Sequence, residues 1–335
     1  MTSEVARFYE MFPFPSPEVG MLTPVSANEA SFLGDVGMLA DNCIDGWQVL
    51  DAGCGTGHNL VARALRYPKA HFIGVDACQR SVDIARHLAE NNSADNIEFV
   101  VGSIPDLDLS KRFDMIICFG VLHHMANPRA GLHWLGEHLA DDGLLHLWLY
   151  NALGEHGRML DRELVQLFTS GDEGKSALET VRVLGLTLSL ARYGLQADWP
   201  TPWMSTAKQD VFDADAYLNP IVQPMRFTDV PALFEGLDMV WVAADQIYSG
   251  GGIKGVDLGG TENDSSLFVG AEELFDDISL RQRVRSLDNL SRMQAIELRL
   301  RPAAFMLLAG RGDSLRRCVP RIRNNLLLTG RTSID

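Results

Sequence analysis

Three glycines at alternate positions follow a short apolar run, as Gly53, Gly55 and Gly57 in the segment VLDAGCGTGHN. Glycine lets a backbone turn tightly and lets a ligand approach without a Cβ atom in the way. Amide groups at the start of the helix expected next suit a carboxylate or another polar end of a ligand. Asp76 stands nineteen residues beyond Gly57, where an acid can accept the hydroxyls of a ribose. These residues indicate a site for a ligand that contains a nucleoside.

The spacing of the glycines argues against two common phosphate-binding motifs. The dinucleotide fingerprint G-x-G-x-x-G needs a third glycine where the chain has His58, counting from Gly53, or Leu60, counting from Gly55. The P-loop pattern G-x-x-x-x-G-K-S/T does not occur in the sequence. A pyrophosphate cradle is therefore not indicated, and a nicotinamide-dependent oxidoreductase is kept only as an alternative.

From Trp47 onward, apolar runs alternate with amphipathic stretches. This alternation is typical of βα units, and strands that are apolar nearly throughout are expected when helices cover both faces of a parallel sheet. The predicted strands are 47–51, 71–75, 97–101, 113–118 and 143–150, and the predicted helices lie near 57–67, 78–91 and 128–140.

The alternation stops after residue 150, and residues 151–225 have the pattern of helices and loops. A helix at 228–236 and a strand at 238–243 are predicted next. The Gly-rich segment Ser249–Gly260 is expected to be a flexible connection or, alternatively, a mobile flap over the site. A long helix over about 278–300 is predicted to lead to a last strand at Ala303–Ala309.

The chain has 335 residues, of which 46% are apolar and 22% charged. This composition is ordinary for one large or two smaller globular domains. No apolar run approaches the roughly 18 residues that a membrane-spanning helix needs, and the first residues do not resemble a secretory signal. Five cysteines without a CxxC pair argue against a disulfide scaffold and against a metal site, and they favour a reducing, cytoplasmic setting.

The formal net charge of −15 makes the chain a poor general binder of nucleic acid. The charge is unevenly distributed, because twelve arginines and four acids follow residue 280, giving +8 there and −23 before it. The basic end is expected either to lie on the acidic body of the chain or to meet an acidic partner.

Five motifs, in this order and at these spacings, resemble those of class I S-adenosylmethionine (SAM)-dependent methyltransferases. They are Asp51–Gly57, the pair Val75-Asp76, Val101–Ile104, Phe119–Met125 and Asp142–Leu144. The resemblance implies SAM as the cofactor and S-adenosyl-L-homocysteine as its product. It also implies an α/β, Rossmann-like fold with a seven-stranded, mostly parallel sheet and an antiparallel last strand, here with helical insertions.

Carried over by position, the resemblance assigns the cofactor contacts. Asp51 and the backbone of Gly53 and Gly55 would face the methionine end of SAM, and Asp76 would hold the ribose. Ser103 departs from the family pattern, since members often have an aspartate there for the adenine amino group. The expected cofactor-binding set is Asp51, Gly53, Cys54, Gly55, Asn59, Asp76, Ala77, Gly102, Ser103, Ile104, Phe119 and Gly120.

Histidines are the candidates for an acid–base role, which is needed only if the methyl acceptor must lose a proton. His123 and His124 follow the fourth predicted strand, and His156 follows the fifth. A histidine titrates near neutrality and can act as a base, although one of a pair often packs or hydrogen-bonds structurally.

Four residues are expected on the acceptor side, namely Tyr9, Tyr150, Asn151 and Arg158. Tyr9, together with Phe12, belongs to an aromatic N-terminal arm that either closes over the cofactor or staples onto the core. For the stretch after Tyr150, the alternative interpretation is a capped helix start with Arg158 on a solvated face.

The expected organisation is an arm (1–40), a SAM-binding core (41–150), a helical lid (151–225), the completion of the core (226–245 and 302–310) around an insertion (246–301), and a basic tail (311–335). A lid over the site favours a small or medium organic acceptor. The alternatives are a protein side chain docked by the arm and the tail, and a SAM-binding partner protein without catalysis. The sequence leaves the oligomeric state open.

Overall fold

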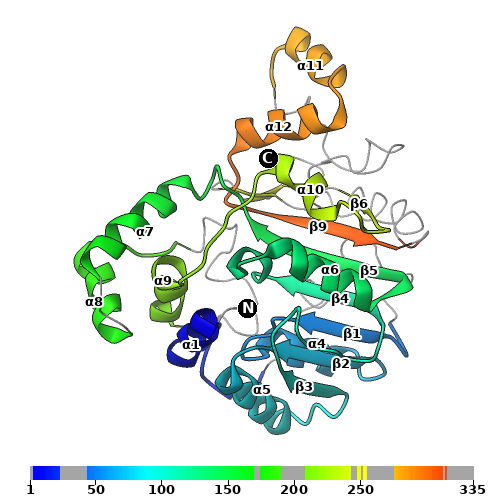
Figure 1. The fold of residues 1–335 in the computed structure, drawn as a ribbon, viewed down its shortest axis with the longest axis vertical. Coiled ribbons are helices and arrows are strands. Elements are labelled where there is room, and N and C mark those ends of the chain that lie inside the picture. Colours follow the sequence, from blue (N-terminus) through cyan, green and yellow to red (C-terminus); the bar gives the residue numbers. More distant parts are fainter. Residues whose placement is uncertain are drawn as a thin grey trace.

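A computed structural model describes residues 3–22, 44–169, 174–189, 208–242, 247–249, 252–254, 275–311 and 314. Within these ranges the strands form one sheet (Figure 1). They are β1 (Gln48–Ala52), β2 (His71–Asp76), β3 (Ile97–Val101), β4 (Phe113–Phe119), β5 (Leu139–Tyr150), β6 (Val240–Val242), β7 (Ile247–Ser249), β8 (Gly252–Lys254) and β9 (Ala304–Gly310).

The first five strands run parallel in the spatial order β3-β2-β1-β4-β5, as the βα alternation predicts. The chain builds outward from β1 to β3 and then crosses to β4 on the other side of β1. The order therefore reverses between β1 and β4, and ligands of such sheets bind at the carboxyl ends of the strands beside this point. The Asp51–Gly57 segment and Phe119 lie at those two strand ends.

The last strand, β9, runs antiparallel to β5, from Leu144 opposite Gly310 to Tyr150 opposite Ala304. On its other edge β9 pairs with β6, so the seven predicted strands and the antiparallel last strand are confirmed. A hairpin of β7 and β8 was not predicted, and β7 pairs with β9 at Phe305 and Ala304. β6 covers only one end of this edge of β9, so backbone N–H and C=O groups at the other end are available to pair with β7. Most of the Gly-rich segment Ser249–Gly260 lies outside the described residues.

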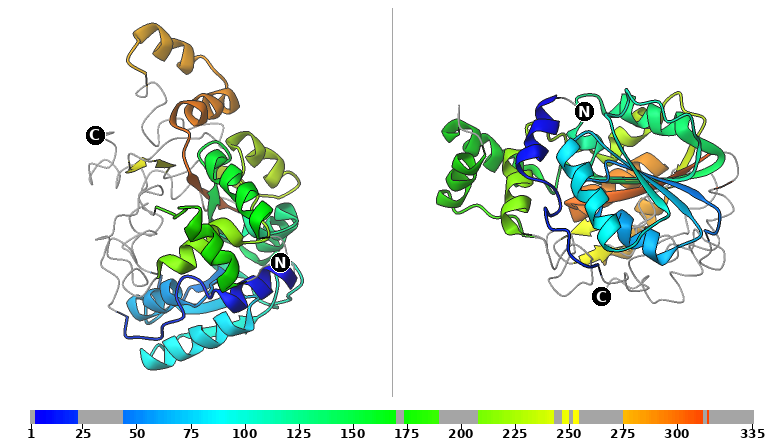
Figure 2. Two further views of the ribbon diagram at one scale, coloured as in Figure 1. Left: turned by 90° about the vertical axis from the view of Figure 1, so that its left-hand side faces the viewer. Right: turned by 90° about the horizontal axis from the view of Figure 1, so that it is seen from below.

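Helices cover both faces of the sheet, as Figures 1 and 2 show. On one face lie α4 (His58–Arg66) and α5 (Gln79–Asn91), and on the other α6 (Pro128–His138) and α10 (Val230–Phe234), the latter after a 3₁₀ turn at Phe227–Asp229. Each face has its own buried cluster, with Val49, Leu60, Phe72 and Leu88 in one and Leu50, Ile116, Leu132 and Phe234 in the other. Burial on both faces explains why these strands are apolar throughout.

Four helices gather at the end of the sheet where β5 finishes, and we call them the helical cap (left in Figure 1). They are α1 (Ser3–Met11), α7 (His156–Phe168), α8 (Lys175–Val183) and α9 (Gln209–Leu218). A third buried cluster holds the cap on the sheet, with Phe8, Val165 and Phe212 packed near Tyr150 and Met306. In the described ranges no helix is long and apolar enough to cross a bilayer.

The prediction of a single long helix over 278–300 is wrong. The chain forms α11 (Ile278–Arg285) and α12 (Asn289–Leu300), which project from the body at the top of Figure 1. The break has a local cause, because the Asp288 carboxylate accepts the Ser291 amide at 2.9 Å and caps a new helix. The basic tail lies outside the described residues, except for Arg311 and Ser314.

Candidate active site

The glycine loop turns sharply between β1 and α4, and all three glycines have positive φ, at 89° for Gly53, 54° for Gly55 and 77° for Gly57. Such angles favour glycine because it has no Cβ. The loop uses its own amides within the protein, since Gly53 donates to the Val75 carbonyl at 2.7 Å and Gly55 to the Asp76 carboxylate at 2.9 Å. The sequence led us to expect free amides here, whereas these two are already bonded.

The Asp76 carboxylate lies at the end of β2 and is 7% exposed. Its two oxygens each accept one amide, from Gly55 and from Cys78, both at 2.9 Å. Burial raises the pKa of Asp76, and the backbone hydrogen bonds from Cys78, Gly55 and Ala77 oppose this. The carboxylate is thus fixed in orientation while each oxygen keeps lone-pair capacity, as the two hydroxyls of a ribose require.

The Asp51 carboxylate lies at the end of β1, beside that of Asp76, and is also 7% exposed. Burial raises the pKa of Asp51 to about 6, with the Arg63 guanidinium opposing the shift and Asp76 adding to it. The nearest guanidinium nitrogen of Arg63 is 3.8 Å from the Asp51 carboxylate. A buried carboxylate with so distant a counter-charge suits the ammonium group of a ligand.

The other expected cofactor positions surround the same strand ends. Gly120, with φ of 74°, follows β4, and among the described residues a Cβ there would meet only the Trp148 ring, at 3.9 Å. Gly102 donates to the Asp76 carbonyl at 2.9 Å, which places the Gly102–Ile104 segment next to the ribose acid. Asn59, Ala77, Cys54, Ser103 and Phe119 are partly exposed around this edge, whereas Ile104 is buried.

The N-terminal arm lies directly over the glycine loop. The Phe14 carbonyl accepts both the amide of Thr56, at 2.9 Å, and its hydroxyl, at 3.1 Å. His58 extends this contact, because its Nδ1 is 2.9 Å from the Thr56 hydroxyl and its Nε2 is 2.9 Å from the Glu18 carbonyl. The roles of Thr56 and His58 were not predicted, although the two polar residues on either side of Gly57 were an available signal.

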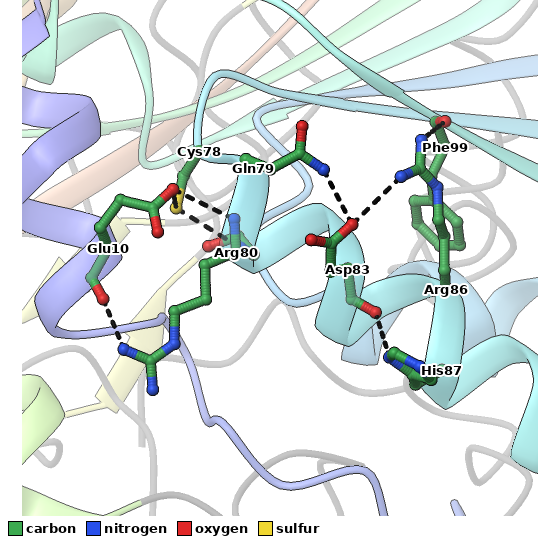
Figure 3. Close-up of polar contacts among 9 residues, drawn as sticks. Glu10, Cys78, Gln79, Arg80, Asp83, Arg86, His87 and Phe99 are labelled. Atoms are coloured by element: carbon green, nitrogen blue, oxygen red, sulfur yellow. Dashed lines mark hydrogen bonds and ion pairs between the residues drawn. The ribbon is translucent and has the colours of Figure 1, made fainter.

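Helix α1 is also fastened to the start of α5, the helix that follows Asp76 (Figure 3). The Glu10 carboxylate accepts the Arg80 amide at 3.1 Å and the Cys78 thiol at 3.2 Å, and Arg80 donates to the Glu10 carbonyl at 2.6 Å. Burial raises the pKa of Cys78 to about 11, so this thiol acts as a donor. The arm therefore contacts both the core and the cofactor edge.

We expect Gly55→Ala to destabilise the chain by about 1–3 kcal/mol. The new Cβ would lie 2.4 Å from the Phe14 carbonyl oxygen, at a φ that alanine adopts only with strain. The matched control is Gly157→Ala in α7, where no atom of the described residues lies within 4 Å of the new Cβ and where alanine favours the helix. Urea unfolding of both variants checks this, and equal stabilities would contradict the close packing of the arm.

His123 and His124 form a 3₁₀ turn after β4, and both are buried. His124 Nδ1 lies 2.6 Å from the Ile221 carbonyl, which can only accept, so Nδ1 carries the proton and Nε2 has the lone pair. Burial lowers the pKa of His124, which keeps the ring neutral near pH 7. His123 Nδ1 receives the Tyr150 amide at 3.3 Å, and burial lowers its pKa further still.

The cap brings Tyr9 to this turn from the far end of the sequence. The Tyr9 hydroxyl donates to Asp215 at 2.8 Å and accepts from the Asn219 amide at 3.0 Å. Burial, followed by Asp215, Tyr150 and Asp76, raises the pKa of Tyr9, so this phenol keeps its proton near pH 7. Asp215 and Asn219 were missed in the sequence, although an acid within the apolar stretch VFDADAYL was a usable signal.

The four remaining predicted residues are Tyr150 and Arg158, which contact each other, and Asn151 and His156. Tyr150 lies under the cap, and the Arg158 guanidinium stacks over its ring at 4.5 Å while also contacting Glu155 and the Ala216 carbonyl. Arg158 is thus buried, not solvated. Asn151 binds Glu297 of α12 at 2.7 Å, a structural contact, and His156 is exposed at the start of α7.

A shallow hollow of about 220 Å³ lies at the opposite edge of the sheet, where the strands begin, and Gln48, His71 and Lys111 are among its lining residues. Ligands of such sheets bind at the carboxyl ends, so we assign no site to it. In the part of the chain that the structure describes, no group of three or more His, Cys, Asp or Glu side chains is placed to hold a metal ion.

The chain is similar to a known protein family over the residues that form this edge of the sheet. A family model described as a methyltransferase domain matches residues 44–179, which include the glycine loop, Asp76 and both histidines. The chain contains a class I SAM-dependent methyltransferase domain. The five parallel strands β1 to β5 lie within the matched residues, whereas the antiparallel β9 lies beyond them and extends the same sheet.

Proteins similar in sequence to this domain include an uncharacterized protein and two named methyltransferases. An uncharacterized protein of Synechococcus is 30% identical over 161 residues, covering 46% of this chain and 38% of that protein. The mitochondrial ubiquinone biosynthesis O-methyltransferase of Schizosaccharomyces pombe is 32% identical over 108 residues, covering 32% and 39%. The (S)-coclaurine N-methyltransferase of Papaver somniferum is 29% identical over 121 residues, covering 36% and 34%. The chain thus spans well under half of each of these relatives.

The similarity in fold to a solved structure extends beyond residues 44–179. The structure of PKMT2 from Rickettsia typhi in complex with AdoHcy superposes with a TM-score of 0.58 at 20% identity, covering 87% of this chain and 54% of that one. Coverage this wide includes more than residues 44–179, so part of the cap and of the later elements shares the fold.

Proposed function

We propose that this chain transfers a methyl group from SAM to an acceptor bound under the helical cap. The observation that carries the proposal is the pair of buried carboxylates, Asp51 and Asp76, at adjoining strand ends, with Asp76 held by the Gly55 amide of the glycine loop. Asp76 would bind the ribose hydroxyls and Asp51 the ammonium of the methionine end. The backbone at Gly120, where among the described residues a Cβ would meet only the Trp148 ring, leaves room beside them.

When bound, SAM would supply a methyl group on a sulfonium, activated for transfer to a lone pair of the acceptor, with S-adenosyl-L-homocysteine as the leaving group. The protein's part is mainly to position the reactants. The Nε2 lone pair of His124 would take a proton from an acceptor that must lose one. The cap would exclude water from the reacting groups.

The acceptor under the cap is proposed to be a small or medium organic molecule. Support comes from the cap itself, in which α1, α7 and α9 meet over Tyr150, and from relatives named for coclaurine and for ubiquinone biosynthesis. The second candidate is a protein side chain docked by the N-terminal arm and the basic C-terminal tail, although the contacts at Glu10 and Phe14 fasten the arm to the core. A SAM-binding protein without catalysis is the third. Among the described residues, Cys54, Cys78 and Cys118 are free thiols, which supports a reducing, cytoplasmic setting.

Methyl-labelled SAM tests the proposal when it is incubated with the purified protein and an extract of the source organism. We expect label in the small-molecule fraction, with the product then identified by mass spectrometry. Label in a protein band would favour the protein acceptor instead. Tight SAM binding without any transferred label would support the non-catalytic protein and contradict the enzyme.

SAM binding is expected to weaken about tenfold between pH 7 and pH 5. Asp51, whose pKa is raised to about 6, must be ionised to hold an ammonium, so its protonation at lower pH removes the acceptor. The raised pKa of Asp76 acts in the same direction. Titration calorimetry across this range measures the effect, with circular dichroism to verify folding at pH 5. The Asp51→Asn variant should bind more weakly and lose most of the pH dependence, and an unchanged dependence would contradict the role of Asp51.

A further inference from the structure

Asp215 presents one carboxylate oxygen that the protein does not use. This side chain on α9 is 6% exposed. Its Oδ1 accepts the Tyr9 hydroxyl at 2.8 Å and the Asn219 amide at 3.1 Å. Across the described ranges, no hydrogen bond or ion pair involves Oδ2. Because Oδ2 is not among the fully buried, unpartnered side-chain atoms of the described residues, it stays accessible and can accept a hydrogen bond from a donor that a ligand brings.

The groups around Asp215 are acceptors as well. Asp215 lies close enough to His124 to raise its pKa against the effect of burial, and His124 keeps its lone pair on Nε2 because Nδ1 donates to the Ile221 carbonyl at 2.6 Å. The Tyr9 hydroxyl has its proton engaged by Asp215. A ligand group that enters here therefore meets oxygen and nitrogen lone pairs, and it must bring N–H or O–H donors.

Two buried guanidiniums near this cluster are engaged elsewhere. Arg158 binds Glu155 and the Ala216 carbonyl, and Arg162 binds the carbonyls of Ala216 and Asn219. Burial and Arg158 lower the pKa of Arg162 to about 10, against the opposing effect of Asp215. These positive charges disfavour a second cation and so favour the neutral form of an incoming amine. An amine must be neutral to attack a methyl group.

We propose that Asp215 Oδ2 binds the reacting nitrogen of the acceptor, and that the acceptor is a primary or secondary amine. The inference rests on the proposed function and deepens it, since a methyl acceptor must reach this side of the cofactor edge. Tyr9 and Asn219 orient the carboxylate by holding Oδ1. The amine arrives protonated, loses a proton to His124 Nε2, and donates its remaining N–H group to Asp215. A phenol or carboxylic acid acceptor would instead need hydrogen-bond donors here, to stabilise the negative charge on its reacting oxygen.

The test uses sinefungin, a SAM analogue with an amine-bearing carbon in place of the methylated sulfur. Its amine occupies the position from which the methyl group leaves and so faces the acceptor nitrogen's site. We expect wild-type protein to bind sinefungin at least tenfold tighter than S-adenosyl-L-homocysteine, because the amine gains charge-assisted hydrogen bonds. The readout is the ratio of the two dissociation constants by calorimetry, and it needs no turnover.

Asp215→Asn should bring this ratio down by at least tenfold while S-adenosyl-L-homocysteine affinity stays within twofold. Asparagine can keep its oxygen on Tyr9 and Asn219 and replaces only the unused Oδ2 with an amide. The matched control is Asp210→Asn, at the exposed start of the same helix, which should leave the ratio unchanged.

A ratio that stays high in a folded Asp215→Asn protein would overturn the inference. If this variant does not fold, the wild-type ratio decides, and sinefungin binding no tighter than S-adenosyl-L-homocysteine would overturn it as well. Failure of both ligands to bind the wild type would instead refute the proposed function, and this inference with it.

Discussion

Asp76→Ala is expected to weaken SAM binding at least tenfold. The substitution removes the carboxylate at the end of β2, which Gly55 and Cys78 hold in place through amide bonds of 2.9 Å. Hydrogen bonds to a charged group contribute about 1.5–3 kcal/mol each, so the loss of even one ribose contact accounts for a tenfold change. Isothermal titration of SAM into wild type and variant measures the effect directly.

Two comparisons make the Asp76 result specific. Asp83→Ala, on the exposed face of α5 where Asp83 contacts Gln79 and Arg86, should bind SAM as the wild type does. Asp76→Asn keeps the side-chain shape and should still weaken binding, because one acceptor oxygen and the charge are lost. SAM affinity in Asp76→Ala equal to that of the wild type would refute the placement of the cofactor.

Glu297→Ala is expected to lower the free energy of unfolding by about 3 kcal/mol or more. This carboxylate of α12 is fully buried. It accepts the Asn151 amide and the Phe227 backbone amide, both at 2.7 Å, and the Arg226 guanidinium at 2.5 Å. Three segments that are distant in sequence thus meet at one side chain, and its removal leaves buried donors without an acceptor.

Urea unfolding followed by circular dichroism tests the Glu297 prediction. The control is Glu179→Ala, which removes an exposed contact with Arg182 and should cost no more than about 1 kcal/mol. SAM binding by folded Glu297→Ala protein should stay within a few-fold of wild type, since this contact lies away from Asp51 and Asp76. A Glu297→Ala variant as stable as Glu179→Ala would show that the contact does not hold α12 to the core.

The sheet and the cofactor edge could be predicted because their signals are local. Apolar runs of strand length located β1 to β5, and the resemblance of five motifs supplied the antiparallel last strand. The same motifs pointed to Asp51, Asp76 and Gly120, which the structure brings to neighbouring strand ends. Residues that follow consecutive parallel strands share an edge whatever the rest of the chain does.

The contacts of the arm and the cap could not be predicted, because they join residues far apart in sequence. Tyr9 contacts Asp215, and Phe14 contacts Thr56, only in the folded chain, and no local sequence pattern indicates either contact. The break between α11 and α12 was missed for another reason, since apolar spacing continued through 278–300 and the capping acid Asp288 was not weighed. The hairpin of β7 and β8 depends on the free edge of β9, which is a property of the folded sheet.

The central claim is that Asp51, Asp76 and the glycine loop form a SAM site, and one titration tests it most directly. SAM, S-adenosyl-L-homocysteine and NADH are each titrated into the full-length protein at pH 7.5 in a calorimeter. We expect one-to-one binding of the first two and no detectable binding of NADH. Binding of NADH without binding of SAM would contradict it and would assign the site to a nicotinamide cofactor.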